Sequence, residues 1–403
     1  MSYENSQQKN NKHQNIISLG SSLDLELTLS LEEKQYESIN IEYKEISKID
    51  DLKQFNSYQS PFKLQKLISL MELKTNNFLF NSLLFINQSS KKKLPIKYII
   101  PFSPKFAKEF NFIYDIIKSI TETNNIYIED SNLLDIKPNI IFTLKLINND
   151  ITVEEKSFLI TNENHYNNPI LDKNKKNENE AQYNGDLFEG LNLNYDCDYF
   201  YSTINELFNC KKNSENEIYE FLQKLINKYQ NVKICINYDE NYLLNNDFLK
   251  NIIEFTNIFI FEKKEIIKFY ENNNDGNDDV KMNNKIENNK KSLVKFFINK
   301  IQITKNQIIK IGIFINNMEE IYLIQQDPKS NLILFQSEEK INLIPININE
   351  ENLKKNNELI TSKYNLIKSA YIGTFLNRLI RQETFEMCLK TALKCSIKYL
   401  EIL

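Results

Sequence analysis

Residues 214–236 read SENEIYEFLQKLINKYQNVKICI, and this stretch decides the class of fold. Its first part places Ile218, Phe221 and Leu225 on one helical face, because apolar residues three or four positions apart share a face. Its last five residues are mostly apolar and predict a short buried strand. Helices and strands then continue to alternate, with helices predicted at 247–254, 264–270 and 293–301 and strands at 258–261 and 311–315. Helices that alternate with buried strands are typical of a parallel sheet covered on both faces.

The first half of the chain mixes short strands with one or two helices. Alternating leucines predict that residues 16–31 form a strand or one arm of a hairpin. Further strands are predicted at 97–101, 126–128 and 140–147, and a helix at 106–120. After the parallel part, β segments are predicted at 320–335 and 342–348, and helices at 367–380 and 384–403. The whole pattern predicts a doubly wound, mostly parallel α/β sheet.

Composition divides the chain into one domain and three polar tracts. Residues 1–14 are rich in Asn, Gln and Lys, so we expect a disordered tail. Residues 162–186 and 271–291 are Asn-rich and are interpreted as low-complexity surface insertions without a function of their own. The remainder of 15–403 is predicted to fold as a single domain.

Charge and hydropathy argue against nucleic-acid and membrane partners. The 50 basic and 54 acidic residues are scattered and sum to −4, without the basic stripe of a nucleic-acid-binding protein. The short basic run at 91–93 is interpreted as the solvated start of a strand. No apolar run reaches the roughly 18 to 20 residues that a spanning helix needs. The first residues show no targeting pattern, so the expected location is the cytoplasm.

Few residues are available for metal or nucleophile chemistry. Only His13 and His165 are present, both among polar neighbours, which disfavours zinc sites and histidine-based nucleophilic catalysis. The five cysteines have no CxxC spacing and are interpreted as reduced, mostly buried thiols. No metal site is predicted.

Two segments near the C-terminus carry a family resemblance. Residues 369–380 read SAYIGTFLNRLI and residues 384–395 read TFEMCLKTALKC. They resemble the last two helices of the ribokinase-like (PfkB) carbohydrate and nucleoside kinases, and the order of elements is similar over most of the chain. The resemblance implies a ribokinase-like fold, in which a small β lid built from N-terminal strands covers the carboxyl edge of the sheet. It also implies a homodimer formed through the lid, whose leucine face at 23–29 would otherwise be an adhesive edge.

The resemblance also implies where a site would lie and what it has lost. Ser369 occupies the position of the family's catalytic Asp, and a serine without a nearby base cannot deprotonate an acceptor hydroxyl. Asn237 stands in place of an Asp. Glu265 is retained from a metal- and phosphate-positioning motif, and Asn316 replaces a Thr near the nucleotide phosphates. Asp24 is at the position of a substrate-binding Asp. If binding is retained, the implied cofactors are ATP and Mg²⁺.

Three hypotheses follow for function. The favoured one is a catalytically degenerate ribokinase-like protein that binds a nucleotide or small polyol or acts as a scaffold. The second is an active ATP-dependent sugar or nucleoside kinase, in which another carboxylate replaces the lost base and the acceptor is an alcohol. The third is a purely structural interaction protein.

Overall fold

The computed structural model describes most elements of the predicted domain. The described residues are 14–21, 24–32, 71–75, 77–100, 111–130, 139–148, 151–160, 196–209, 215–238, 252, 255–262, 311–316, 320–325, 333–336 and 353–402. Predictions for residues 1–13, 162–186, 271–291, 264–270, 293–301 and 342–348 therefore fall outside the described residues, and so does most of the helix predicted at 247–254.

The main sheet has nine strands in the order β13-β12-β11-β10-β9-β8-β1-β4-β5. Its strands are β1 (Ile16–Leu19), β4 (Ile96–Ile100), β5 (Ile126–Asp130), β8 (Tyr199–Thr203), β9 (Lys233–Tyr238), β10 (Ile258–Glu262), β11 (Ile311–Asn316), β12 (Glu320–Gln325) and β13 (Ile333–Gln336). All neighbours from β5 to β11 are parallel, and β12 and β13 add an antiparallel edge. The predicted mostly parallel α/β sheet is confirmed.

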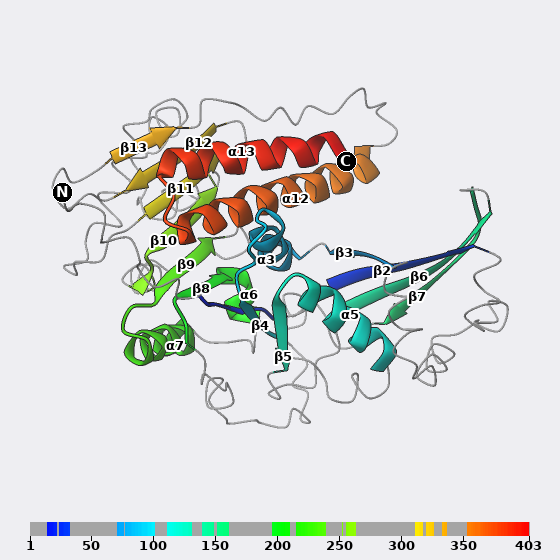
Figure 1. Cartoon of the computed structure of the whole chain (residues 1–403), viewed down its shortest axis with the longest axis horizontal. Coiled ribbons are helices and arrows are strands. Elements are labelled where there is room, and N and C mark those ends of the chain that lie inside the picture. Colours follow the sequence, from blue (N-terminus) through cyan, green and yellow to red (C-terminus); the bar gives the residue numbers. More distant parts are fainter. Residues whose placement is uncertain are drawn as a thin grey trace, which may run out of the picture.

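A separate four-stranded sheet has the order β3-β2-β6-β7. Its strands are β2 (Asp24–Glu32), β3 (Met71–Thr75), β6 (Asn139–Asn148) and β7 (Ile151–Ile160). Strands β2 and β6 are parallel, and the outer pairs are antiparallel. In Figure 1 this sheet extends to one side of the main body. We call it the lid sheet.

The prediction for residues 16–31 needs correction. These residues form two strands in different sheets, because the chain leaves the main sheet after Leu19 and enters the lid sheet at Asp24. Alternating leucines mark both as strands but do not reveal a change of sheet. The leucine face is also not an exposed edge, since Leu25, Leu27 and Leu29 are buried within the chain. The argument for a dimer through this face therefore loses its premise.

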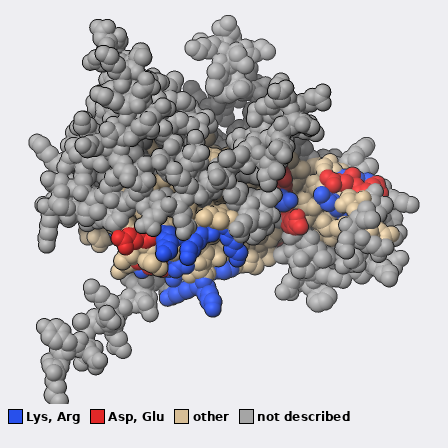
Figure 2. Space-filling view, turned by 90° about the horizontal axis from the view of Figure 1, so that it is seen from above, with Lys and Arg blue, Asp and Glu red and all other residues tan. Residues whose placement is uncertain are grey.

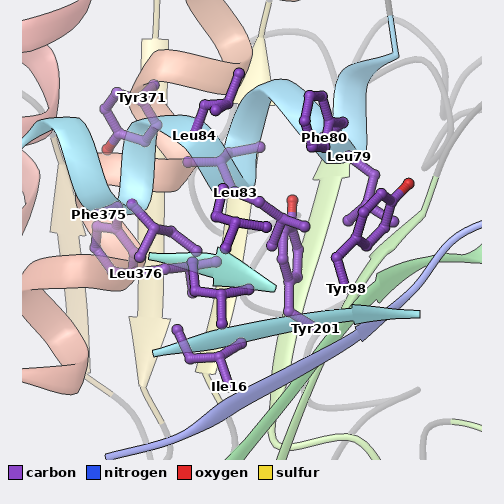
Figure 3. Close-up of a cluster of buried hydrophobic side chains, with 14 of the residues drawn as sticks. Ile16, Leu79, Phe80, Leu83, Leu84, Tyr98, Tyr201, Tyr371, Phe375 and Leu376 are labelled. Carbon is purple, nitrogen blue, oxygen red and sulfur yellow. The ribbon is translucent and has the colours of Figure 1, made fainter. Parts of the chain in front are cut away.

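Helices pack on both faces of the main sheet (Figure 1). The described helices are α3 (Phe78–Gln88), α5 (Asn111–Thr123), α6 (Ile204–Asn209), α7 (Glu215–Lys228), α12 (Leu353–Ile380) and α13 (Phe385–Ile402). Alternate side chains of each strand point to opposite faces. On one face Tyr98 and Tyr201 lie under α3 and α12 (Figure 3). On the other, Phe200 meets Phe221 of α7, with ring centroids 5.4 Å apart.

Helices α3 and α12 approach each other closely at Gly373. A Cβ atom at Gly373 would lie 2.4 Å from the Ser82 carbonyl oxygen and 2.7 Å from Phe85 Cβ, so only glycine fits there. One turn further along, Asn377 Nδ2 donates to the Ile86 carbonyl oxygen at 2.7 Å. The two helices are thus fixed to each other by close approach and by a buried hydrogen bond. None of the described helices is long and apolar enough to cross a membrane.

Candidate functional site

Polar residues collect where three neighbouring parallel strands end. Ser21 follows β1, Glu206 follows β8 in the first turn of α6, and Asn237 lies near the end of β9. Parallel strands bring their carboxyl ends to one edge of the sheet, and ligands of open α/β sheets bind outside that edge. This edge is the candidate site.

Glu206 organises the part of the edge near β1. Its Oε2 accepts hydrogen bonds from the Ser21 backbone N–H at 2.5 Å and from Ser21 Oγ at 2.6 Å. Its Oε1 accepts one from Asn77 Nδ2 at 2.8 Å, and Asn77 in turn caps α3 by accepting from the Phe80 N–H at 2.8 Å. Charge-assisted bonds of this kind are among the stronger hydrogen bonds in proteins. The carboxylate is therefore engaged on both oxygens.

Gly20 lets β1 end beneath a tyrosine. A Cβ atom there would lie 2.2 Å from Tyr98 Oη and 2.7 Å from Tyr98 Cζ. Any larger residue would displace this buried ring, which stacks on Phe80 with centroids 5.5 Å apart. The glycine thus keeps the exit of β1 close to α3.

Asn237 differs from these residues because its amide has no hydrogen-bond partner. The side chain is 1% exposed, and neither Nδ2 nor Oδ1 is hydrogen-bonded. It stands in register with Thr203 of β8 and Ile260 of β10. Since Cys235, two positions earlier, belongs to the core under α12, Asn237 points to the same face. A buried donor and acceptor that both lack partners are rare in native proteins.

Ser369 lies in the interior of α12, a continuous helix of 28 residues. This helix begins at Leu353, not at Ile367 as the sequence predicted. Ser369 is fully buried, and its Oγ lies 2.7 Å from the Asn365 carbonyl oxygen and 3.2 Å from that of Phe78. Its hydroxyl is therefore bonded to backbone carbonyls and is not oriented by a basic side chain.

The same segment does not fit a transferred phosphate. An anion site at a helix start uses backbone N–H groups that have no partner within the helix. At Ser369 the helix has already run for several turns, so the N–H groups there are engaged in helical hydrogen bonds. The neighbouring Lys368 is buried, with its Nζ 4.8 Å from the centre of the Phe78 ring. No phosphate cradle exists at this point of the described chain.

The other predicted site residues lie elsewhere or outside the described residues. Asp24 begins β2 of the lid sheet, and Asn316 ends β11, paired across the ladder with Glu320 of β12. The side chains of Asp24 and Asn316 are not described. Glu265 lies outside the described residues. Their proposed roles remain predictions.

Metal and thiol chemistry finds little support in the part of the chain that the structure describes. No three His, Cys, Asp or Glu side chains gather there in a way that could hold a metal ion. Cys197, Cys235, Cys388 and Cys395 are free thiols. Burial raises the pKa of Cys197 and of Cys388 to about 12, so both are protonated at neutral pH and are poor nucleophiles.

A cavity of about 550 Å³ lies at the opposite, amino edge of the main sheet. Its lining includes Tyr199, Lys233, Asn257 and Phe385, from the starts of strands and from α13. Lys233 Nζ lies 3.3 Å from Tyr199 Oη, and Asn257 Oδ1 accepts a hydrogen bond from the Ile234 N–H at 2.8 Å. These polar groups pair within the protein, in contrast to Asn237.

Basic side chains gather on one part of the described surface, beside acidic ones (Figure 2). Near the end of α3, arginines of the α12–α13 region donate to backbone carbonyls: Arg378 to that of Ser89 and Arg381 to that of Lys92. Arg378 also pairs with Glu383 at 2.8 Å. Cations are favourable near a helix C-terminus, so these contacts fasten the α12–α13 turn to α3.

Sequence patterns did not single out Ser21, Glu206 or Asn77 as residues of the site. Glu206 is an acidic residue in the first turn after a strand, and Asn77 precedes the apolar run of α3 as an N-cap. Both positions are common in purely structural roles. Only the meeting of segments 129 residues apart, at the Asn77–Glu206 bond, marks them as parts of one site.

Comparisons with known proteins place the chain beside solved kinase structures. No family model matches the sequence, and no curated protein matches it. Adenosine kinase from Anopheles gambiae aligns at 13% identity over 94% of each chain, with a TM-score of 0.47. Adenosine kinase from Schistosoma mansoni with bound tubercidin aligns at 12% identity over 96% of this chain and 94% of that one, with a TM-score of 0.49. Ribokinase from Giardia lamblia aligns at 12% identity over 96% and 90%, with a TM-score of 0.44.

Likeness at this level gives no information on substrate or activity. The architecture itself is defined by the strand order, the parallel ladders from β5 to β11 and the separate lid sheet. The chain therefore has the architecture that the sequence predicted, a mostly parallel α/β sheet with helices on both faces and a second, small β sheet (Figure 1).

Proposed function

We propose that the chain binds a small molecule with vicinal hydroxyl groups, a nucleoside or a polyol, at the carboxyl edge of the main sheet and does not transfer phosphate. The observation that carries the binding proposal is the Asn237 amide, which is 1% exposed and unpaired. An unpaired buried amide costs about 1–3 kcal/mol, and a bound molecule that supplies both a donor and an acceptor removes this cost. Adjacent hydroxyl groups supply both.

The absence of phosphate transfer is inferred from two side chains. Ser369 is buried inside α12 with its hydroxyl on backbone carbonyls, and a serine there has no base to activate it. Glu206 is the carboxylate that the described chain brings to this edge close to β1, and its two oxygens accept hydrogen bonds from Ser21 and Asn77. Neither group is available to take a proton from an acceptor hydroxyl.

Thermal-shift measurements test the binding proposal. Adenosine, ribose, ATP and ADP are added separately to the whole chain and to its Asn237→Leu variant. A binding ligand at 100 times its Kd should stabilise the wild type by about 2.7 kcal/mol and leave the variant unshifted. Asn257→Leu, at the amino edge, serves as the matched control and should keep the shift. If no compound raises the unfolding temperature of the wild type, the binding proposal is wrong and the result favours the scaffold hypothesis.

A phosphotransfer assay tests the second half of the proposal. Purified protein with ATP and Mg²⁺ should give no phosphorylated product from nucleosides or sugars. Product formation that is lost in Glu265→Ala would overturn the proposal and establish the active-kinase alternative.

A further inference from the structure

Two of the connections between the main body and the lid sheet, β1–β2 and β3–α3, pass the same carboxylate in the part of the chain that the structure describes. Residues 20–23 lead from β1 into β2, and residues 76–77 lead from β3 into α3. Glu206 belongs to the main body, in α6 directly after β8. It bonds Ser21 in the first connection and Asn77 in the second. One side chain thus contacts both described routes between the two sheets.

The surroundings of Asn77 determine what kind of group must face it. Asn77 Oδ1 accepts from the Phe80 N–H, and its own N–H donates to Thr75 Oγ1 at 3.0 Å. Asn81 Nδ2 holds the same corner by donating to the Thr75 carbonyl oxygen at 2.7 Å. With Oδ1 committed to the helix cap, Asn77 presents its NH₂ group to Glu206. The facing group must therefore accept a hydrogen bond.

The other side of Glu206 also requires an acceptor. The Ser21 N–H is a fixed backbone donor 2.5 Å from Oε2, and Ser21 Oγ lies 2.6 Å from the same oxygen. Glu206 itself is oriented by its backbone N–H, which donates to Thr203 Oγ1 at 3.1 Å. An ionised carboxylate accepts on both oxygens, whereas an isosteric amide accepts on only one.

We infer that Glu206 is a lid-positioning residue, whose carboxylate holds the β1–β2 and β3–α3 connections against α6 and so fixes the lid sheet relative to the main sheet. This inference goes beyond the proposed function and needs no ligand. Loss of the carboxylate should release the lid sheet while the main sheet stays folded.

Hydrogen exchange of Glu206→Gln in the whole, ligand-free chain tests the inference. Whichever way the new amide turns, its NH₂ group meets either the Asn77 NH₂ or the Ser21 N–H. Losing one such bond should speed amide exchange in β2, β3 and β6 roughly tenfold, and leave β9 and β10 within about twofold of the wild type. Equal acceleration in both sheets, or no change in the lid strands, would overturn the inference.

A second variant reverses the polarity of the Asn77–Glu206 bond. In Glu206→Gln with Asn77→Asp, the glutamine NH₂ faces a carboxylate, and aspartate remains a good helix cap. The double variant should exchange more slowly in the lid strands than either single variant, since Asn77→Asp alone sets two carboxylates against each other. Additive acceleration would show that the bond does not position the lid.

Two further variants separate positioning from general stability. Ser21→Ala removes the hydroxyl bond but keeps the backbone bond, so its effect on lid exchange should be smaller than that of Glu206→Gln and in the same direction. Glu383→Gln removes the carboxylate paired with Arg378 in the α12–α13 turn and should leave lid exchange unchanged. If Glu383→Gln loosens the lid as much as Glu206→Gln, the inference is wrong.

Discussion

Asn257 and Asn237 lie at opposite edges of the same sheet and differ in what they bond. Asn257, just before β10, accepts a hydrogen bond from the Ile234 N–H on its Oδ1 and donates its backbone N–H to the Ile234 carbonyl oxygen. Asn237, near the end of the neighbouring strand, is buried with its amide unpaired. The amino edge is therefore complete as a structure, although a cavity lies there. At the carboxyl edge, the Asn237 amide has no hydrogen-bond partner.

The comparison shows that a cavity and a buried polar group without hydrogen-bond partners can lie at different places in the same sheet. A cavity lined by paired groups gives a ligand little reason to bind beyond apolar contact. An enclosed amide without partners makes the empty state costly, and the proposed ligand would remove this cost. The following predictions test this contrast.

The largest change in stability is expected where α12 contacts α3. Gly373→Ala should lower the free energy of unfolding by about 3 kcal/mol, because the new methyl group would meet the Ser82 carbonyl oxygen and the helices must separate. Urea unfolding measures this. Lys390→Ala, on the exposed side of α13, is the control and should stay within about 0.5 kcal/mol. If Gly373→Ala leaves the free energy of unfolding unchanged, the two helices are not in this close contact.

Asn257→Leu should destabilise the chain by about 2 kcal/mol in the same assay. It leaves the N–H of the fully buried Ile234 without a partner, and an unpaired buried donor has a cost of this size. Ligand shifts should persist. If the stability does not change, the Asn257 side chain does not stabilise the amino edge.

Asn237→Leu should act in the opposite direction and raise the free energy of unfolding by about 1 kcal/mol. Leucine has a similar volume and carries no polar group to leave unpaired. The gain should come with loss of ligand binding, which thermal shift reports. A destabilised variant would show that the amide has protein or water partners and that the two edges are alike.

The smallest effect is expected at Gln382, which lines the amino-edge cavity in the α12–α13 turn. Its φ of 61° lies in the left-handed region that favours glycine after a helix. Gln382→Gly should therefore stabilise by about 0.5–1 kcal/mol and leave ligand binding unchanged. Thermal unfolding would detect this gain, and a loss of stability would show that the Gln382 side chain contributes contacts of its own.

Much of the main sheet could be predicted from local patterns. Buried parallel strands are continuous apolar runs, and the strands at 258–261 and 311–315 were placed within a residue of β10 and β11. Strand β8 and helix α3 were missed. Residues 199–203 read YFYST and residues 78–88 read FLFNSLLFINQ, and neither shows the period of its structure because both are buried on nearly all sides.

The site was harder to predict than the fold. The sequence led to Ser369 through a family pattern, but it could not show that α12 begins at Leu353 and encloses that serine. Glu206 and Asn77 form a site only because two distant connections meet, and no local pattern records such a meeting. The sequence indicates Asn237 as a replaced acid, whereas its lack of partners depends on how its strand packs between β8 and β10.

The central place of β1 has a consequence for how the chain reaches this structure. The strand lies between β4 and β8, and the Asn15 N–H bonds the Asp198 carboxylate across 183 sequence positions. During synthesis the first strand must therefore wait until residues 199–203 have left the ribosome before its second ladder can form. Such distant pairing slows folding and leaves apolar strand edges uncovered meanwhile. In a shortened chain that ends before β8, one edge of β1 would stay unpaired, and the chain would be prone to aggregate.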